Sequence, residues 1–198
     1  MLGFSRCWVY DEGLATRDVY VVMSAIASAT QNIEIGPGIT NPYTRHPAQT
    51  SMAIASLDEL SQGRAFLGIG AGGSLTLNPL AIERKKPLSA VRDTISIARK
   101  LFSGQQTSYQ GSIASLKNAQ IKFARPDIEI WLAGRGPRML ALGGEEADGV
   151  MLDFIYKPQI AEYVQRIRKN GNAKIFKDGA KSPGTARVTA TRQSHKVQ

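Results

Sequence analysis

Short apolar runs alternate with amphipathic stretches along most of this chain. The apolar runs are bounded by glycine, proline or polar residues and are too short for helices, so each predicts a β-strand. These predicted strands cover residues 6–10, 32–39, 65–70, 128–133 and 149–155. Apolar residues at helical spacing predict helices over residues 18–30, 47–62, 88–102, 137–146 and 158–168. Strands that alternate with helices form a parallel sheet covered by helices, so the pattern indicates an α/β fold. It leaves a doubly wound sheet and a (β/α) barrel equally open.

Two segments depart from this alternation. Residues 105–127 contain two short polar stretches around a Gly-Ser turn and predict a hairpin insertion. Residues 171–198 are polar and basic without a convincing period, which favours a disordered tail. We therefore expect one folded domain over residues 1–170 and a basic tail over residues 171–198.

The net charge of +9 raises the question of nucleic-acid binding. Residues 169–198 carry seven Lys or Arg and one acidic residue, whereas residues 1–168 carry eighteen and fifteen. The excess charge thus belongs to the tail, and residues 177–198 contain no Phe, Tyr or Trp on which bases could stack. We expect no nucleic-acid partner.

The sequence also disfavours a metal-binding protein and a membrane protein. The single cysteine, Cys7, has no second thiol with which to bind a metal, and His46 and His195 lie far apart without clustered carboxylates. No apolar run approaches the ~20 residues that cross a bilayer, and no basic and apolar leader is visible. The expectation is a cytoplasmic protein with neither metal nor membrane partner.

Polar and glycine-rich residues follow the predicted strands directly. Since the carboxyl ends of parallel strands face the ligand crevice in barrels and open sheets alike, these segments predict one site at one rim. They are residues 11–12, 36–41, 70–74 and 134–138, together with Asp153.

The stretch Gly134–Arg138 is the best local motif. Gly136 allows a ligand close to the backbone, and Pro137 suits the first position of a helix. The free amides of that first turn, the helix dipole and Arg138 or Arg135 would suit a phosphate. When the motif is taken alone, an ordinary turn from strand to helix is the favoured explanation.

Three other features are weaker indications of a ligand site. Residues 70–73 lack the full spacing of a dinucleotide fingerprint, so a Rossmann site is rejected. The run Gly36-Pro37-Gly38 is odd within a strand and suggests either a bulge or a simple strand end. Asp11 and Glu12 are adjacent, so in an extended segment one would face the site while the other caps or faces solvent.

Four segments then follow one another at a familiar spacing. They are residues 40–47 (TNPYTRHP), 57–64 (LDELSQGR), 67–72 (LGIGAG) and 133–139 (AGRGPRM). Together they resemble the luciferase-like monooxygenase family, specifically its branch similar to methylenetetrahydromethanopterin reductase, over about residues 3–168.

The resemblance implies a (β/α)8 TIM barrel, with the deazaflavin coenzyme F420 or FMN as hydride carrier for a small organic substrate. It implies a cofactor contact for Asp11, and a bulge behind the ring at Gly38 and Ile39 that in relatives contains a non-proline cis peptide. It further implies that Thr40 and Asn41 contact the polar edge of the ring. The implied tail contacts are Ala71, Gly72 and Gly73, and the implied phosphate contacts are Gly134, Gly136 and Pro137.

Two departures from the family pattern shape the expectation. Only five barrel strands are identifiable, so we expect a partial barrel that lacks the first and last strands. Glu12 stands where some relatives have a histidine that works in proton transfer, which makes Glu12 the candidate catalytic residue.

The leading hypothesis is therefore an oxidoreductase that uses the deazaflavin coenzyme, with little or no turnover expected from the fragment alone. The alternatives are an FMN-dependent monooxygenase and a non-catalytic remnant that binds flavin or only dimerises. In this family the helices that match residues 18–30 and 47–62 form a dimer interface, so a homodimer is expected.

Overall fold

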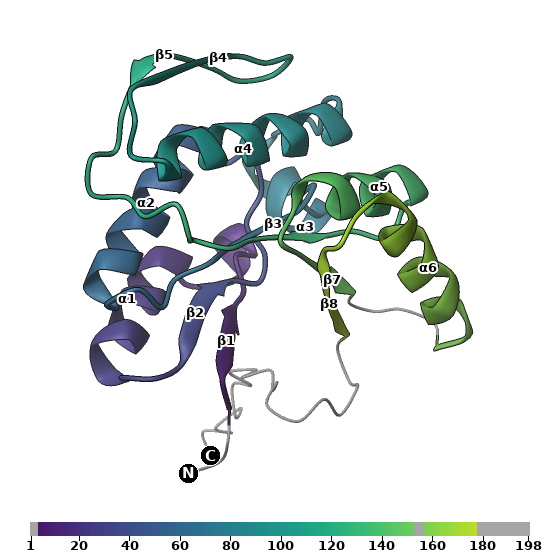
Figure 1. The fold of residues 1–198 in the computed structure, drawn as a ribbon, viewed down its shortest axis with the longest axis horizontal. Helices are drawn as coiled ribbons and strands as arrows, with labels where there is room; N and C mark the ends of the chain where they lie inside the picture. Colours follow the sequence, from purple (N-terminus) through teal and green to yellow (C-terminus); the bar gives the residue numbers. More distant parts are fainter. Residues whose placement is uncertain (1–3, 153–156, 178–198) are drawn as a thin grey trace.

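The computed structural model describes residues 4–152 and 157–177. At its centre is a run of parallel strands in the order β1, β2, β3, β6, β7, β8 (Figure 1). Parallel bridges from Ile35 to Ala65 and from Thr40 to Ile69 join β2 to β3. The strands are β1 (Arg6–Val9), β2 (Glu34–Pro37), β3 (Leu67–Ile69), β6 (Ile130–Ala133), β7 (Gly149–Leu152) and β8 (Lys174–Lys177). The expected parallel α/β architecture is confirmed, and each of the five predicted strands forms within its predicted range.

Helices follow the strands and cover the outer face of the sheet (Figure 1). The longer ones are α1 (Val19–Ala29), α2 (Pro47–Leu60), α4 (Pro87–Phe102), α5 (Pro137–Glu146) and α6 (Ile160–Asn170). Short helical segments are η1 (Gly13–Ala15), α3 (Ser74–Leu77), η2 (Asn78–Leu80) and η3 (Lys157–Gln159). Local signals fix several helix starts: the Asp18 carboxylate accepts hydrogen bonds from the amides of Tyr20 and Val21, and Pro47, Pro87 and Pro137 each begin a helix.

Strand β8 corrects the predicted domain boundary. It pairs with β7 in parallel register from Lys174 opposite Gly149 to Lys177 opposite Leu152. The fold therefore continues past residue 170, where the tail was expected to begin. The run Lys174–Lys177 holds two apolar residues between two lysines, a pattern too short to predict a strand until β7 supplies its hydrogen-bond partners. Residues 178–198 of the expected tail lie outside the described residues.

The predicted hairpin insertion is confirmed as β4 (Thr107–Gln110) and β5 (Ser115–Ala119), which pair in antiparallel fashion. It lies over α4 (Figure 1). The Asp93 carboxylate on α4 accepts hydrogen bonds from the amides of Ile113 and Ala114, at 2.7 and 3.2 Å, and from the Tyr109 hydroxyl at 2.9 Å. One buried carboxylate therefore holds the hairpin on the outer surface, away from the strand ends.

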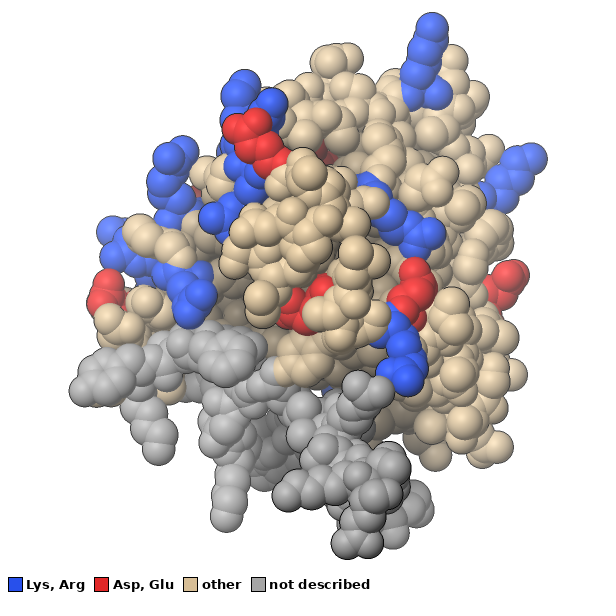
Figure 2. Space-filling model, turned by 180° about the vertical axis from the view of Figure 1, so that it is seen from behind, with Lys and Arg blue, Asp and Glu red and all other residues tan. Residues whose placement is uncertain are grey.

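Charged side chains are spread over the molecular surface. On the face drawn in Figure 2, Lys and Arg are scattered, with acidic side chains among them, rather than gathered into one patch. Within the described residues, no group of three or more His, Cys, Asp or Glu is placed to hold a metal ion. None of the helices in that same part of the chain is long and apolar enough to cross a membrane.

Alternate side chains of each strand divide the interior into two cores. Outward-facing residues such as Ile35, Leu67 and Ile130 are fully buried against the helices. Inward-facing Trp8, Phe66, Trp131 and Met151 pack on one another within the sheet. The Trp8 ring meets those of Phe66 and Trp131 edge to face, with centroids 4.4 and 5.6 Å apart.

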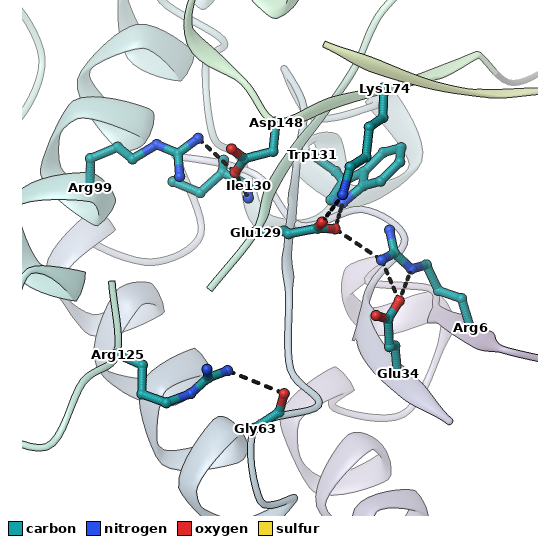
Figure 3. Close-up of polar contacts among 10 residues, drawn as sticks. All are labelled: Arg6, Glu34, Gly63, Arg99, Arg125, Glu129, Ile130, Trp131, Asp148 and Lys174. Carbon is teal, nitrogen blue, oxygen red and sulfur yellow. Dashed lines mark hydrogen bonds and ion pairs between the residues drawn. The ribbon is translucent and has the colours of Figure 1, made fainter. Parts of the chain in front are cut away.

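A charged cluster lies beneath these rings, at the amino ends of the strands (Figure 3). The Glu129 carboxylate accepts hydrogen bonds from Arg6 at 2.9 Å, from the Trp131 indole at 2.8 Å, and from Lys174. Arg6 also pairs with Glu34, and its guanidinium lies 4.6 Å from the Trp131 ring centroid. The cluster thus joins β1, β2, the start of β6 and β8 through side chains.

The environment of Glu129 changes its acidity. Burial alone would raise the pKa of Glu129, but the hydrogen bonds from Lys174, Trp131 and Arg6 and the charge of Arg6 outweigh burial and lower the pKa from 4.5 to about 2. Because the folded-state pKa is the lower one, the carboxylate stabilises the fold above pH 4.5. That stabilisation is lost as the pH falls toward 2.

We predict that Glu129→Gln lowers the free energy of unfolding at pH 7 by about 2 kcal/mol, because the buried Arg6 loses one of its two charged partners and Lys174 loses its ion pair with Glu129. Between pH 4.5 and 2 the difference from the unsubstituted protein should shrink, since Glu129 is itself neutralised there. Urea unfolding at several pH values measures both effects. Glu145→Gln is the control, because Glu145 is an exposed carboxylate 3.9 Å from Arg92 and should matter little. Equal losses for the two variants would contradict the assigned role of Glu129.

Candidate functional site

The carboxyl ends of four strands surround one cavity. Its volume is about 590 Å³, and it is bounded by the segments that follow β1, β2, β3 and β6. Eleven of the thirteen residues that the sequence assigned to the site line it: Asp11, Glu12, Gly38, Ile39, Thr40, Asn41, Ala71, Gly72, Gly73, Gly134 and Gly136. Parallel strands bring their ends to the same side, so segments more than a hundred residues apart meet here.

The two neighbouring carboxylates both line this cavity, as the family resemblance implied, whereas strand alternation alone would have placed only one of them there. Thr40, which is buried, donates a hydrogen bond from Oγ1 to Asp11 Oδ2 at 2.6 Å. Thr76 donates from Oγ1 to Glu12 Oε2 at 3.2 Å. Both can face the cavity because Glu12 leaves the extended conformation, with φ −98° and ψ 32°, so strand alternation does not apply to it.

The segment that leads to Thr40 contains the expected irregularity. The peptide bond between Gly38 and Ile39 is cis, which confirms the expectation drawn from the family. The pairing with β3 also shows the expected bulge, because residues 36–39 lie opposite only residues 66–68 between the two bridges that join these segments. Gly36 and Gly38 serve packing as well, since a Cβ on either would collide with Phe66 or Trp8.

Asn41 has a structural task as well as a place in the cavity wall. Its Oδ1 accepts hydrogen bonds from the amides of Tyr43 and Thr44, at 2.9 and 3.0 Å, and from the Thr44 hydroxyl. The side chain therefore shapes the turn that leads into α2. What Asn41 has left to offer a ligand is its NH2 group.

Two glycines of the cavity wall differ from the others in having open space where a side chain would lie. A Cβ built on Gly73 or Gly136 would have no atom within 4 Å, and both residues adopt extended backbone angles open to any residue. Neither packing nor conformation explains their lack of a side chain. By contrast, Gly72 has φ +73° and Gly134 packs against Met139. Gly73 and Gly136 leave room for a ligand to lie directly against the backbone.

The remaining two predicted residues do not reach this cavity. Pro137 and Arg138 line a separate groove between α5 and α6, together with Ala141 and Arg166. Because side chains turn by about 100° per residue around a helix, the first turn of α5 carries Arg138 away from the strand ends. Gly136 lies at the N-cap of α5, and no side chain caps that helix end.

The cavity also contains residues that sequence reasoning did not assign to it. They are Tyr10, Thr76, Arg84, Pro87, Ala133, Met139 and Met151. Arg135, which the sequence offered as an alternative phosphate ligand, lines the cavity too. The short helix α3, which brings Thr76 into position, has too few residues for a periodic signal. Asp153, expected at the rim, lies outside the described residues.

Comparison with known proteins shows to which protein family this chain is related. Residues 1–195 match the luciferase-like monooxygenases. A 5,10-methylenetetrahydromethanopterin reductase from Archaeoglobus fulgidus is 39% identical over 151 residues, which are 76% of this chain and 45% of the relative. The chain thus spans about half the length of that curated relative.

Solved structures agree on the fold. The coenzyme F420 dependent tetrahydromethanopterin reductase from Methanopyrus kandleri has a TM-score of 0.77 and 29% identity, over 88% of this chain and 56% of that chain. The oxygenating constituent of 3,6-diketocamphane monooxygenase from Pseudomonas putida, in complex with FMN, has a TM-score of 0.67. At 20% identity, over 86% of this chain and 54% of that chain, this likeness concerns the fold alone. The expected partial luciferase-like barrel is confirmed.

The contrast among the glycines generates a stability prediction. Gly73→Ala and Gly136→Ala should change the free energy of unfolding by less than about 1 kcal/mol, because their Cβ atoms enter open space. Gly36→Ala should cost about 2 kcal/mol, because its Cβ would overlap the Phe66 ring. Thermal and urea unfolding of the three variants without ligand measures this difference. Similar losses in all three would mean that the first two glycines serve packing.

Proposed function

We propose that this chain, which belongs to the luciferase-like monooxygenase family, forms the coenzyme-binding part of an oxidoreductase. Its cofactor is the deazaflavin coenzyme F420 or a flavin, and its substrate is a small organic molecule. The observation that carries the proposal is the pair Gly73 and Gly136, which leave the cavity wall bare at places where no atom of the described residues fills the space. Because the chain spans about half of its relatives, the activity is proposed for the complete barrel.

The residues present fit a flavin-type coenzyme. A cavity of about 590 Å³ lies within the usual range of ~300–1,000 Å³ for sites of small molecules and cofactors. Its wall combines apolar side chains, such as Ile39 and Met151, with the polar groups of Asp11 and Thr40. An aromatic ring with a polar edge and a long flexible tail requires this mixture of surfaces.

Residues of this chain would hold the coenzyme in two ways. Ile39, behind the cis peptide, offers an apolar surface to the ring, while Thr40 keeps the Asp11 carboxylate fixed beside it. Gly73 and Gly136 offer backbone to the tail and its phosphate, and the uncapped start of α5 favours an anion. When bound, the coenzyme supplies the hydride chemistry.

Glu12 is the proposed proton-transfer residue. Its Oε2 is held by Thr76, which leaves Oε1 as the atom able to exchange a proton with a substrate in the cavity. Thr76 orients the carboxylate in the way that a general acid or base requires. The second acid, Asp11, is held by Thr40 and keeps a positioning role.

Two alternatives stay testable. An FMN-dependent monooxygenase would use the same cavity, and the absorbance spectrum of the bound cofactor distinguishes the two coenzymes. A non-catalytic remnant would bind cofactor without turnover. An anaerobic assay of reduced-coenzyme oxidation with carbonyl, alcohol and pterin substrates separates that case from catalysis.

We predict that Gly136→Asp removes coenzyme binding while keeping the fold. The new carboxylate would repel the phosphate, yet aspartate at an N-cap stabilises a helix, so α5 should not suffer. Fluorescence titration with F420 and FMN measures binding, and circular dichroism verifies folding. Unchanged affinity in a folded variant would refute the phosphate assignment.

A homodimer and a cytoplasmic location complete the proposal. Supporting the dimer, Val21 on α1 and Met52 and Leu60 on α2 are exposed, at 69%, 48% and 51%. Ala55 of α2 is buried and serves the core.

We predict that the chain sediments as a dimer at micromolar concentration, and that Val21→Lys with Met52→Lys shifts it toward monomer. Both side chains are exposed in the single chain, so the substitutions should not unfold it. The control is Leu80→Lys, which replaces an exposed apolar residue outside both helices. A monomer at every concentration would contradict the proposed interface.

A further inference from the structure

Arg84 is an exposed arginine that lines the cavity and forms no ion pair among the described residues. It follows η2 and lines the cavity, and its Nη1 donates a hydrogen bond to the Gly72 carbonyl at 2.9 Å. On the next residue, the Lys85 carbonyl accepts a hydrogen bond from the Tyr43 hydroxyl at 2.9 Å. The backbone next to Arg84 and one of its guanidinium nitrogens are therefore both held in place.

Arg135 comes from a different segment of the cavity wall. It precedes Gly136 in the segment between β6 and α5, and it lines the same cavity. Arg135 is thus the chain neighbour of one bare glycine, Gly136, while Arg84 is bonded to Gly72, the chain neighbour of the other. Both arginines are solvent-exposed, so they lie at the edge of the cavity.

The charges of these two arginines are not balanced by nearby acids. Across the described ranges, neither guanidinium forms an ion pair within 4.0 Å. The acid next to Arg84 in sequence, Glu83, pairs with Lys85 at 3.1 Å. The two acids of the cavity are held by threonines. The cavity edge therefore carries two positive charges available to a ligand.

We propose that Arg84 and Arg135 form an anion-binding pair that selects a coenzyme with a polyanionic tail. This rests on the proposed function and decides between its two coenzymes. FMN offers one phosphate monoester, which a single cationic site satisfies. Coenzyme F420 carries a phosphodiester followed by glutamate carboxylates, so its charges extend along the tail. Two arginines on segments after different strands match charges that are spread out.

The test measures the affinity of the whole 198-residue chain for three probes. They are F420 with its glutamate tail, the same coenzyme without glutamates, and FMN, each titrated by fluorescence. We expect the tailed coenzyme to bind most tightly. Arg84→Gln should weaken tailed binding about threefold to fivefold, as loss of one exposed ion pair would, and leave the tail-less form nearly unchanged. Added salt should reduce the preference for the tail.

Two further variants separate charge from structure. Arg84→Lys alters the hydrogen bond to Gly72 but retains the charge, so the tail preference should largely remain. Arg92→Gln removes an arginine that pairs with Glu146 at 3.0 Å and does not line the cavity, so it should change nothing.

The outcomes distinguish this inference from the proposed function. If Arg84→Gln weakened the binding of the tailed and tail-less coenzymes equally, or weakened neither, selection of the tail by the arginines would be overturned. The proposed coenzyme site would be unaffected by that result. If FMN bound as tightly as the tailed coenzyme, selection of the tail would likewise be overturned. If the unsubstituted chain bound none of the three probes, the proposed function would fall and the inference with it.

Discussion

The carboxylate of Glu129 is the constraint on which the arrangement of the strands depends. It lies half-buried at the amino ends of the strands, where a charge needs partners, and its ion pairs with Arg6 and Lys174 bring β1 and β8 to the strand that it precedes. Aromatic side chains fill the layer above this cluster. The charged and aromatic side chains consequently fill the space at the amino ends of the strands. The cavity forms at the carboxyl ends.

The glycines show how this division works residue by residue. Gly36 and Gly38 make room for the rings of the inner core, while Gly72 and Gly63 adopt left-handed backbone angles that turns require. Gly73 and Gly136 do neither and face the cavity. One residue type thus serves packing, backbone geometry and ligand access, and only the three-dimensional surroundings tell these uses apart.

The polar groups of the cavity are divided in a similar way. Its acids, Asp11 and Glu12, are each fixed by a threonine that comes from another segment. Its arginines have no acidic partner among the residues that the structure describes. Fixed acids suit the positioning of a ring and the movement of a proton, whereas available cations suit an anionic tail. The two kinds of charge would therefore serve opposite ends of one elongated ligand.

The sequence by itself determined the order of the strands and helices, the parallel sheet, the hairpin and most of the cavity wall. Apolar periodicity, prolines such as Pro137 at helix starts and glycine-rich strand ends are local signals that need no partner. The tertiary structure alone decided that Lys174–Lys177 pairs as a strand, that Glu12 turns into the cavity with Asp11, and that Arg138 points away from it while Arg84 points in. Each of these depends on a contact with a distant segment or on the rotation of a helix against the sheet. A run of neighbouring residues in the sequence specifies neither the contact nor the rotation.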